Sequence, residues 1–200
     1  MSHYFHTPEG PVTQRRIAAT IFDHDHTFTT AGGVFSGSRL DPGTAVLLRT
    51  FEPPQSGHLL DLGCGFGPIA VGLAVAGPAV TVDAVDVNAL AVELTRVNAA
   101  EAGVADRVRA TAPDDVPPDA TYSQIWSNPP IRIGKEALHT LLLTWLPRLT
   151  PDGVARLVVS KNLGGDSLQR WLIDQGYPTE RVASTKGFRI LEVSPASSAA

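Results

Sequence analysis

The stretch that decides the fold class runs from Asp61 to Gly67 and reads Asp-Leu-Gly-Cys-Gly-Phe-Gly. It follows a short strand predicted over residues 58–61 and precedes an apolar helix predicted over residues 68–76. Glycines at such a junction tolerate a positive φ and allow a ligand to come close to the backbone. A strand, a glycine loop and a helix in this order predict an α/β fold that binds a ligand beyond the carboxyl end of the strand.

The rest of the chain continues this alternation of strands and helices. Before the loop, the sequence predicts an extended region over residues 12–30 and a helix from Asp41-Pro42 to about Phe51, with aspartate as its N-cap. Strands that alternate with helices predict a mostly parallel sheet covered by helices on both faces. After the loop, strands are predicted over residues 79–86, 108–112, 122–127 and 154–160, helices over 88–102, 136–149 and 167–175, and a closing antiparallel pair over 181–185 and 188–193.

Length and composition exclude several classes of protein. A chain of 200 residues with 43% hydrophobic residues can bury the core of one domain, and its 18% charged residues do not suit a charge-driven disordered chain. The net charge of −4 excludes general attraction to nucleic acid, although not a transiently held nucleic-acid substrate. The single cysteine, Cys64, excludes an internal disulfide and a cysteine-based zinc cluster.

Neither a secretory signal nor a membrane span is expected. The first ten residues contain no apolar core of a signal peptide. The longest uncharged stretch, residues 62–82, has about the length of a membrane span but is interrupted by five glycines and two prolines. A cytoplasmic protein without membrane contact is therefore expected.

Two cofactors compete for the glycine loop. Gly65-x-Gly67-x-x-Ala70, with Asp86 near the position of a ribose-binding acid, fits a dinucleotide. S-adenosyl-L-methionine is the alternative, because it has no pyrophosphate and carries cationic groups. Asp61 favours the second cofactor, since a carboxylate directly before the loop repels a pyrophosphate and attracts a cation.

The stretch from Ser127 to Ile131 reads Ser-Asn-Pro-Pro-Ile and follows the predicted strand 122–127. Two prolines end a strand, but a strand end does not require the preceding asparagine. An exocyclic amine with a delocalised lone pair must become more tetrahedral before it attacks a methyl group. The Asn128 carboxamide oxygen and the Pro129 carbonyl are suited to accept its two N–H groups and to stabilise the charge that develops on nitrogen.

Together these strings resemble the class I small-domain (MTS) methyltransferases, and the resemblance covers most of the chain. The glycine loop resembles their motif I and Asn128-Pro129-Pro130 their motif IV, where Ile131 replaces the usual aromatic residue. The resemblance is closest to single-domain relatives of the bacterial 16S ribosomal RNA guanine-N2 methyltransferases. Its further strings are Gly33-Val-Phe-Ser36, Leu40-Asp-Pro-Gly-Thr44, Asn128-Pro-Pro-Ile-Arg-x-Gly-Lys135 and Thr185-Lys-Gly-Phe-Arg-Ile190.

This resemblance implies a Rossmann-like seven-stranded sheet and a division of the chain. Residues 1–52 are expected to form an N-terminal extension of strands and a helix, residues 53–194 the methyltransferase domain, and residues 195–200 a frayed tail. The larger ribosomal RNA enzymes of the family carry a second, degenerate methyltransferase half, which is not expected in this chain. RNA binding by that half must then be replaced here, or the substrate differs.

The resemblance also implies a set of site residues. Asp86 is expected to pair with the ribose hydroxyls of S-adenosyl-L-methionine, while Asn88 is equally well explained as a helix cap. Cys64 has no nearby base to make it a nucleophile. Thr44 and Asp114 are expected near the site by the resemblance. The alternative for Thr44 is an ordinary helix residue, and the alternative for Asp114 is a solvated residue of a turn. Catalytic residues are then Asn128, Pro129, Pro130 and Ile131, and cofactor contacts Asp61, Gly63, Cys64, Gly65, Gly67, Asp86, Val87, Asn88, Asp114, Thr44 and Asn128.

Substrate contacts are expected from one aromatic and several basic residues. Phe35 is expected both to contact the substrate and to pack as a core aromatic. For the basic residues, the alternative to a substrate contact is that they are ordinary surface charges. The charge is uneven: residues 1–127 hold seven basic and 14 acidic side chains, whereas residues 128–200 hold nine and six. A small basic rim around one pocket is therefore expected. The expected substrate contacts are Phe35, Arg132, Lys135, Lys186 and Arg189.

The segment from Asp23 to His26 raises the possibility of a metal site. Alternation along a strand places His24 and His26 on one face, but no third ligand is evident nearby. A solvated strand is favoured, and no metal is expected.

The sequence therefore predicts an S-adenosyl-L-methionine-dependent methyltransferase that modifies the exocyclic N2 of a guanine in ribosomal RNA, with the small subunit favoured. The partner is ribosomal RNA or a ribosomal subunit, and the oligomeric state is left open. One alternative is methylation of a protein glutamine amide or a small amine, for which the same Asn128 chemistry serves. The other is a non-catalytic cofactor-binding assembly factor.

Overall fold

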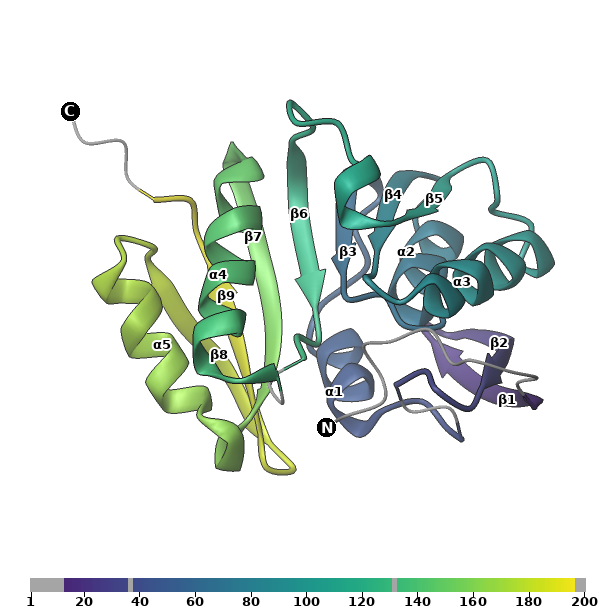
Figure 1. Cartoon of the computed structure of the whole chain (residues 1–200), viewed down its shortest axis with the longest axis horizontal. Coiled ribbons are helices and arrows are strands. Elements are labelled where there is room, and N and C mark those ends of the chain that lie inside the picture. Colours follow the sequence, from purple (N-terminus) through teal and green to yellow (C-terminus); the bar gives the residue numbers. More distant parts are fainter. Residues whose placement is uncertain (1–12, 36–37, 131–132, 197–200) are drawn as a thin grey trace.

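The chain is built around one seven-stranded sheet (Figure 1). The computed structural model describes residues 13–35, 38–130 and 133–196. The strand β9 runs antiparallel to both of its neighbours, and the other pairs are parallel. This confirms the predicted Rossmann-like fold. In spatial order the strands are β5 (Val108–Thr111), β4 (Ala79–Val85), β3 (Ser56–Leu62), β6 (Tyr122–Ser127), β7 (Leu149–Ser160), β9 (Phe188–Val193) and β8 (Thr179–Thr185).

Helices cover both faces of the sheet and bury two separate apolar clusters. Alternate residues of β3 divide between them, because successive side chains of a strand point to opposite faces: Leu59 joins one cluster and Leu60 the other. The central strands β3, β4, β6 and β7 each contribute residues to both clusters, whereas β5 contributes only to the first. The first face carries α1 (Pro42–Thr50), α2 (Pro68–Ala76) and α3 (Ala89–Glu101), and the second carries α4 (Lys135–Trp145) and α5 (Gly165–Asp174).

The N-terminal part adds a separate two-stranded ribbon of β1 (Gln14–Ile21) and β2 (His24–Ala31). Figure 1 shows the ribbon beside α3, at the same end of the sheet as α1. Ile21 and Phe28 belong to the buried cluster that contains the residues of α2. The predicted strands and helix of the N-terminal extension are therefore present and share the core, while the predicted boundaries at residues 52 and 194 stay predictions.

A buried amide fixes the ribbon to the sheet domain. Asn98 of α3 is 1% exposed, accepts from the amide of Thr29 (2.7 Å) and donates to the carbonyl of Thr29 (2.9 Å). The same Nδ2 donates to the carbonyl of Phe66 in the glycine loop (2.8 Å). One side chain thus links β2 to the loop that the sequence assigns to the cofactor.

Asn98→Ala is expected to lower the free energy of unfolding by about 3 kcal/mol, because it leaves three buried backbone groups without a partner at about 1–3 kcal/mol each, less what water recovers. Thermal unfolding of the purified chain measures this. Val97→Ala is the matched control, since Val97 is the neighbouring residue of the same helix and is 36% exposed. Equal melting temperatures for the two variants would contradict the linking role of Asn98.

The predicted end of one helix and the predicted start of the next strand are wrong, since the strand expected over residues 154–160 begins at Leu149. The helix expected over residues 136–149 ends at Trp145 and continues as a short 3-10 turn, Leu146–Arg148, before Leu149 opens β7. Pro147 explains the change, since it has no amide hydrogen to continue the α-helical ladder. Two further 3-10 turns, Pro113–Asp115 and Lys161–Leu163, follow β5 and β7. Within the described ranges, no helix is long and apolar enough to span a membrane.

Candidate active site

The glycine loop closes over the end of the sheet as predicted. Gly63, Gly65 and Gly67 have φ values of 78°, 59° and 87°. Gly67 also needs to be small, because a Cβ there would lie 2.8 Å from Cγ2 of Thr95. The amides of Gly63 and Cys64 both donate to the carbonyl of Val85 at the end of β4 (2.8 and 3.1 Å). The loop is therefore held in place by the neighbouring strand.

Asp61 lies at the end of β3 and is fully buried. Its Oδ2 accepts from the amide of Ala70 in α2 (3.0 Å), whereas its Oδ1 has no hydrogen-bond partner among the described residues. Burial, with a smaller contribution from the charge of Asp86, raises the pKa of Asp61 to about 7. A buried carboxylate oxygen without a donor suits a cationic group, and the ammonium of S-adenosyl-L-methionine is such a group.

Asp86 joins the loop to the start of α3. Its Oδ2 accepts from the amide of Gly65 (2.9 Å) and its Oδ1 from the amide of Asn88 (2.9 Å), while burial raises its pKa. The Asn88 side chain accepts from the amide of Leu90 (3.0 Å) and donates to the carbonyl of Gly33 (3.0 Å). The helix-cap interpretation of Asn88 is thus correct. The same amide also ties the N-terminal segment, through Gly33, to the start of α3.

Asn128 follows β6 and lies beside the glycine loop. Ser127 donates to the carbonyl of Leu62 (2.6 Å), and a Cβ on Gly63 would lie 3.8 Å from the Pro130 ring. These contacts bring the predicted catalytic loop against the predicted cofactor loop. The Nδ2 of Asn128 donates to Oδ1 of Asp41 (2.8 Å) and to Oγ1 of Thr44 (3.0 Å).

One cavity joins three segments that are far apart in the sequence. The cavity is lined by the N-terminal segment, by the glycine loop with the start of α2, and by the catalytic loop. Cys64 is buried there, with its Sγ 3.5 Å from Oγ1 of Thr95, and burial raises the pKa of its thiol, so it is not an activated nucleophile. The lining residues are Phe35, Asp41, Thr44, Gly63, Cys64, Gly65, Phe66, Pro68, Ile69 and Asn128.

The predicted residues outside this lining are distributed around it. Val87 is 63% exposed directly after Asp86, and Asp114 is exposed in the turn that follows β5. Phe35 lines the cavity and is 47% exposed, so it is not a core aromatic, and its contact with the substrate stays a prediction. Ile131 and Arg132 lie outside the described residues.

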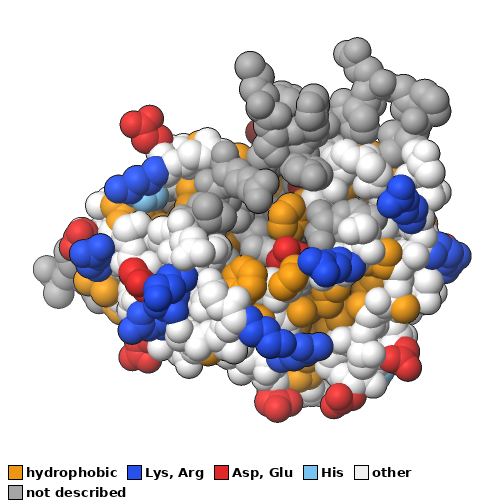
Figure 2. Space-filling view, turned by 90° about the horizontal axis from the view of Figure 1, so that it is seen from below, with side chains coloured by type: hydrophobic (Ala, Val, Ile, Leu, Met, Phe, Trp, Pro, Cys, Tyr) orange, Lys and Arg blue, Asp and Glu red, His pale blue; other side chains and the backbone are white. Residues whose placement is uncertain are grey.

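The predicted basic contacts differ in their availability. Lys135 is exposed at the start of α4, and Lys186 is exposed at the turn of the β8–β9 hairpin. Arg189 is only 11% exposed at its side chain and is held by Asp166 (2.9 Å) and Ser184. Figure 2, which views the molecule from the side of α1, shows Lys and Arg side chains spread among hydrophobic ones.

Sequence reasoning missed three residues that build the site. Asp41 was expected only as an N-cap, and its contact with Asn128 spans 87 positions, for which the sequence gives no signal. Thr95 donates to the carbonyl of Gly65 (3.1 Å) from α3, and Asn98 holds Phe66. Both lie on the buried side of a helix. A polar residue at a buried helix position is the one signal in the sequence that could have indicated such a hydrogen bond.

The segment around His26 is part of the ribbon. His26 is 8% exposed and stacks on Phe28 with ring centroids 5.4 Å apart, and burial lowers its pKa. Asp25 accepts from Thr20 (2.8 Å) across the hairpin. Among the residues that the structure describes, no three His, Cys, Asp or Glu side chains are grouped to hold a metal ion.

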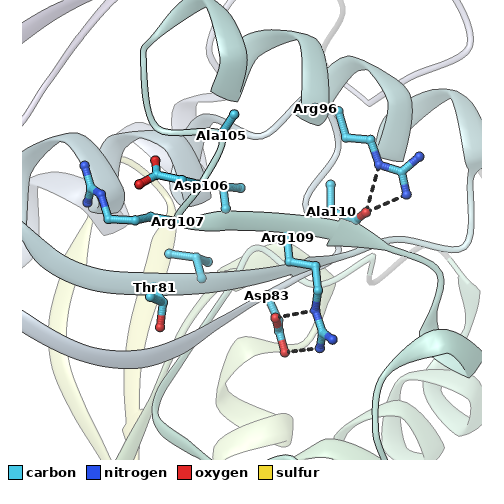
Figure 3. Close-up of a pocket in the computed structure, with 10 residues that line it drawn as sticks. Thr81, Asp83, Arg96, Ala105, Asp106, Arg107, Arg109 and Ala110 are labelled. Atoms are coloured by element: carbon cyan, nitrogen blue, oxygen red, sulfur yellow. Dashed lines mark hydrogen bonds and ion pairs between the residues drawn. The ribbon is translucent and has the colours of Figure 1, made fainter.

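A larger hollow of about 430 Å³ lies at the outer edge strand β5 (Figure 3). Its three arginines are engaged by the protein: Arg96 donates to the carbonyl of Ala110, Arg107 to carbonyls at the end of α2, and Arg109 forms a bidentate pair with Asp83. It shares no lining residue with the cavity at Asn128. Its side chains therefore support the edge of the sheet.

Comparison with known proteins places this chain in one family. The family "Methyltransferase small domain" matches residues 25–192. An uncharacterized protein of Bacillus subtilis, YbxB, is 32% identical over 194 residues, which cover 95% of this chain and 96% of that protein. The ribosomal RNA small subunit methyltransferase C of Pseudomonas aeruginosa is 34% identical over 92% of this chain but only 55% of its own length.

Among solved structures, the 16S rRNA N2 G1207 methyltransferase of T. thermophilus, in complex with AdoMet and guanosine, superposes with a TM-score of 0.81. It is 23% identical, and the match covers 94% of this chain and 52% of that one, so it supports the fold. The chain thus spans about half the length of the ribosomal RNA methyltransferases that it matches. It belongs to the methyltransferase small domain family, and it is an S-adenosyl-L-methionine-dependent methyltransferase.

Proposed function

We propose that this chain transfers a methyl group from S-adenosyl-L-methionine to the exocyclic N2 of a guanine in ribosomal RNA, with the small subunit favoured. The observation that carries the proposal is the placement of the Asn128 amide. Both of its N–H groups are directed to Asp41 and Thr44, and within the described ranges its Oδ1 accepts no hydrogen bond. That oxygen is therefore available to accept from an amine in the cavity.

The cofactor is proposed to lie along the glycine loop. Asp61 would hold its ammonium group through the unpartnered Oδ1, and Asp86 its ribose hydroxyls through the remaining lone pairs of its carboxylate. Val87 and Asp114 would flank the adenine. The cofactor supplies a methyl group on a sulfonium, which makes that methyl electrophilic.

The protein's part in the reaction is orientation and charge stabilisation. The guanine N2 lone pair is delocalised into the ring, so the amine must become more tetrahedral before its nitrogen bonds to the methyl carbon and the S–CH₃ electron pair returns to sulfur. Asn128 Oδ1 would accept one N–H and the Pro129 carbonyl the other, which holds the lone pair in line and stabilises the charge on nitrogen. The proton then leaves to water.

Recognition of RNA is proposed to come from a few residues around the cavity. Phe35, 47% exposed beside Asn128, would stack on the guanine, which must be unpaired or flipped out. Lys135 and Lys186, together with Arg132, would contact phosphates, and Arg189 would support the hairpin. The relatives named for ribosomal RNA favour a ribosomal partner, and hence a cytoplasmic reaction.

Methyl transfer from labelled cofactor tests this proposal. Purified chain is incubated with naked ribosomal RNA, 30S particles and 50S particles in parallel, and nucleoside digests are separated. We expect label in N2-methylguanosine from the small-subunit RNA. Label in glutamine of the protein fraction instead would assign the alternative substrate, and cofactor binding without transfer to any substrate would favour a non-catalytic assembly factor.

A further inference from the structure

We infer that Asp41 is a positioning residue for methyl transfer, because it alone decides which way the Asn128 carboxamide faces. This inference rests on the proposed function, since it concerns the group that would hold the substrate amine. Asp41 reaches Asn128 from α1, the helix that follows the N-terminal ribbon. The N-terminal segment thereby contributes to the catalytic loop as well as to the core.

A single oxygen of Asp41 receives three donors. Its Oδ1 accepts from the amides of Gly43 (2.8 Å) and Thr44 (3.1 Å), which caps α1, and from Nδ2 of Asn128 (2.8 Å). The positive end of the helix favours a carboxylate at this place. The contact is therefore a charge-assisted hydrogen bond that Asn128 donates to a half-buried carboxylate.

The carboxylate determines the orientation of the amide because it has no hydrogen to donate. If the Asn128 amide turned by half a rotation, its oxygen would face the Asp41 oxygen at hydrogen-bond distance, and the two would repel each other. Thr44 makes the second contact, but its hydroxyl both donates and accepts and therefore suits either orientation. Asp41 is thus the partner that discriminates and keeps Oδ1 available to the substrate.

The position of Asp41 is itself fixed by packing. A Cβ on Gly43 would lie 2.9 Å from Oδ1 of Asp41 and 3.0 Å from the ring of Phe188. The backbone of Gly43 and the ring of Phe188 therefore pack closely around the carboxylate. Behind it, Val46 and Leu47 anchor α1 in the buried cluster. A carboxylate on a packed helix can hold its partner more precisely than one on a free loop.

The test compares two replacements that keep the helix cap. Serine is as good an N-cap as aspartate but is too short to reach Asn128, whereas asparagine keeps an oxygen at the position of Oδ1. We expect Asp41→Ser to lower kcat by up to about 100-fold, the loss typical of a misplaced group, with the Kd of S-adenosyl-L-methionine within about twofold of wild type. Asp41→Asn is expected to recover most of the lost rate.

Thr44→Val is the matched control, since it removes the hydroxyl that does not discriminate and retains the shape of the side chain. It is expected to lower kcat less than Asp41→Ser does. Wild-type kcat in Asp41→Ser would overturn the inference. Parallel losses of kcat, cofactor affinity and melting temperature would also overturn it, because they would reduce Asp41 to a structural cap.

A spectroscopic measurement separates this inference from the proposed function. The side-chain amide of Asn128, assigned by its loss in Asn128→Ser, is expected to exchange slowly with water in wild type and Asp41→Asn, and faster in Asp41→Ser. Unchanged exchange in Asp41→Ser would overturn the positioning role. If wild type methylates no RNA, protein or ribosomal fraction, the proposed function fails, while the exchange measurement still decides whether Asp41 orients the amide.

Discussion

Asn128→Ala is expected to lower kcat for methyl transfer about 100- to 1,000-fold, while the Kd of S-adenosyl-L-methionine changes less than about twofold. The magnitude follows from the loss of one group that stabilises developing charge in a transition state, for which about 3–4 kcal/mol is typical. Cofactor affinity is expected to remain because the proposed cofactor contacts of Asp61 and Asp86 come from other strands. Single-turnover methyl transfer and calorimetric titration of the cofactor measure the two quantities separately.

Two further variants sharpen this experiment. Asn128→Asp retains the size of the side chain but sets a second carboxylate against Asp41, which lies 2.8 Å from the wild-type Nδ2. It is therefore expected to be as inactive as the alanine variant. Asn162→Ala is the matched control, because Asn162 is exposed in the turn after β7. Equal losses of kcat and cofactor affinity in Asn128→Ala would argue against an amine-orienting role.

Much of the fold was predictable because its signals are local. The glycine loop, the proline at the start of α2 and the Asn88 cap each determine backbone geometry within a few residues, and the predicted limits of α2 and β6 agree with the structure. The alternation of strands with helices, which is visible along the chain, identified the parallel sheet. The misplaced end of α4 shows the limit of periodicity, since the apolar pattern continues through Pro147 although the hydrogen-bond ladder does not.

Part of the lining of the candidate site was predictable from the sequence, but the connections between its residues were not. The residue types of Asp61 and Asn128 carry their chemistry in the sequence. The hydrogen bond between Asn128 and Asp41, and those from Asn98 to Thr29 and Phe66, join positions far apart in the chain. Such pairs depend on tertiary packing, which periodicity and propensity do not encode. The sequence predicted Phe35 and Thr44 of the N-terminal extension as site residues, but not the hydrogen bonds by which Asp41 and Thr44 hold Asn128.

Asp61→Asn is expected to abolish measurable cofactor binding, with a loss above about 100-fold in affinity, and at the same time to stabilise the protein without cofactor. The first effect follows from removing the negative charge proposed to hold an ammonium group. The second follows from burial, which raises the pKa of Asp61 to about 7, far above the ordinary aspartate value of about 3.9. Above pH 7 the wild-type protein retains a buried charge that unfolding would release to water.

The pH dependence of this stabilisation follows from the two pKa values. Between about pH 4 and pH 7 the folded state holds a proton on Asp61 that the unfolded state has lost, so wild-type stability falls by about 1.4 kcal/mol for each pH unit. The total is about 4 kcal/mol, reached above pH 7. Because asparagine does not titrate, Asp61→Asn is expected to be more stable than wild type by up to about 4 kcal/mol at pH 8 and nearly equal to it at pH 4.

Asp83→Asn is the matched control, and it is expected to change the stability at pH 8 in the opposite direction. Asp83 is also buried, at 3% exposed, but both of its oxygens bind Arg109 (2.9 and 2.7 Å), and Tyr122 donates to it as well (2.9 Å). Its replacement removes a compensated charge and is expected to destabilise the protein at pH 8, since it leaves Arg109 and Tyr122 with a weaker partner. Denaturant unfolding of both variants at pH 5 and pH 8 makes the comparison. A loss of stability in Asp61→Asn at pH 8 would mean that the Asp61 charge is compensated within the protein, and it would remove the basis for assigning its free oxygen to a cationic cofactor.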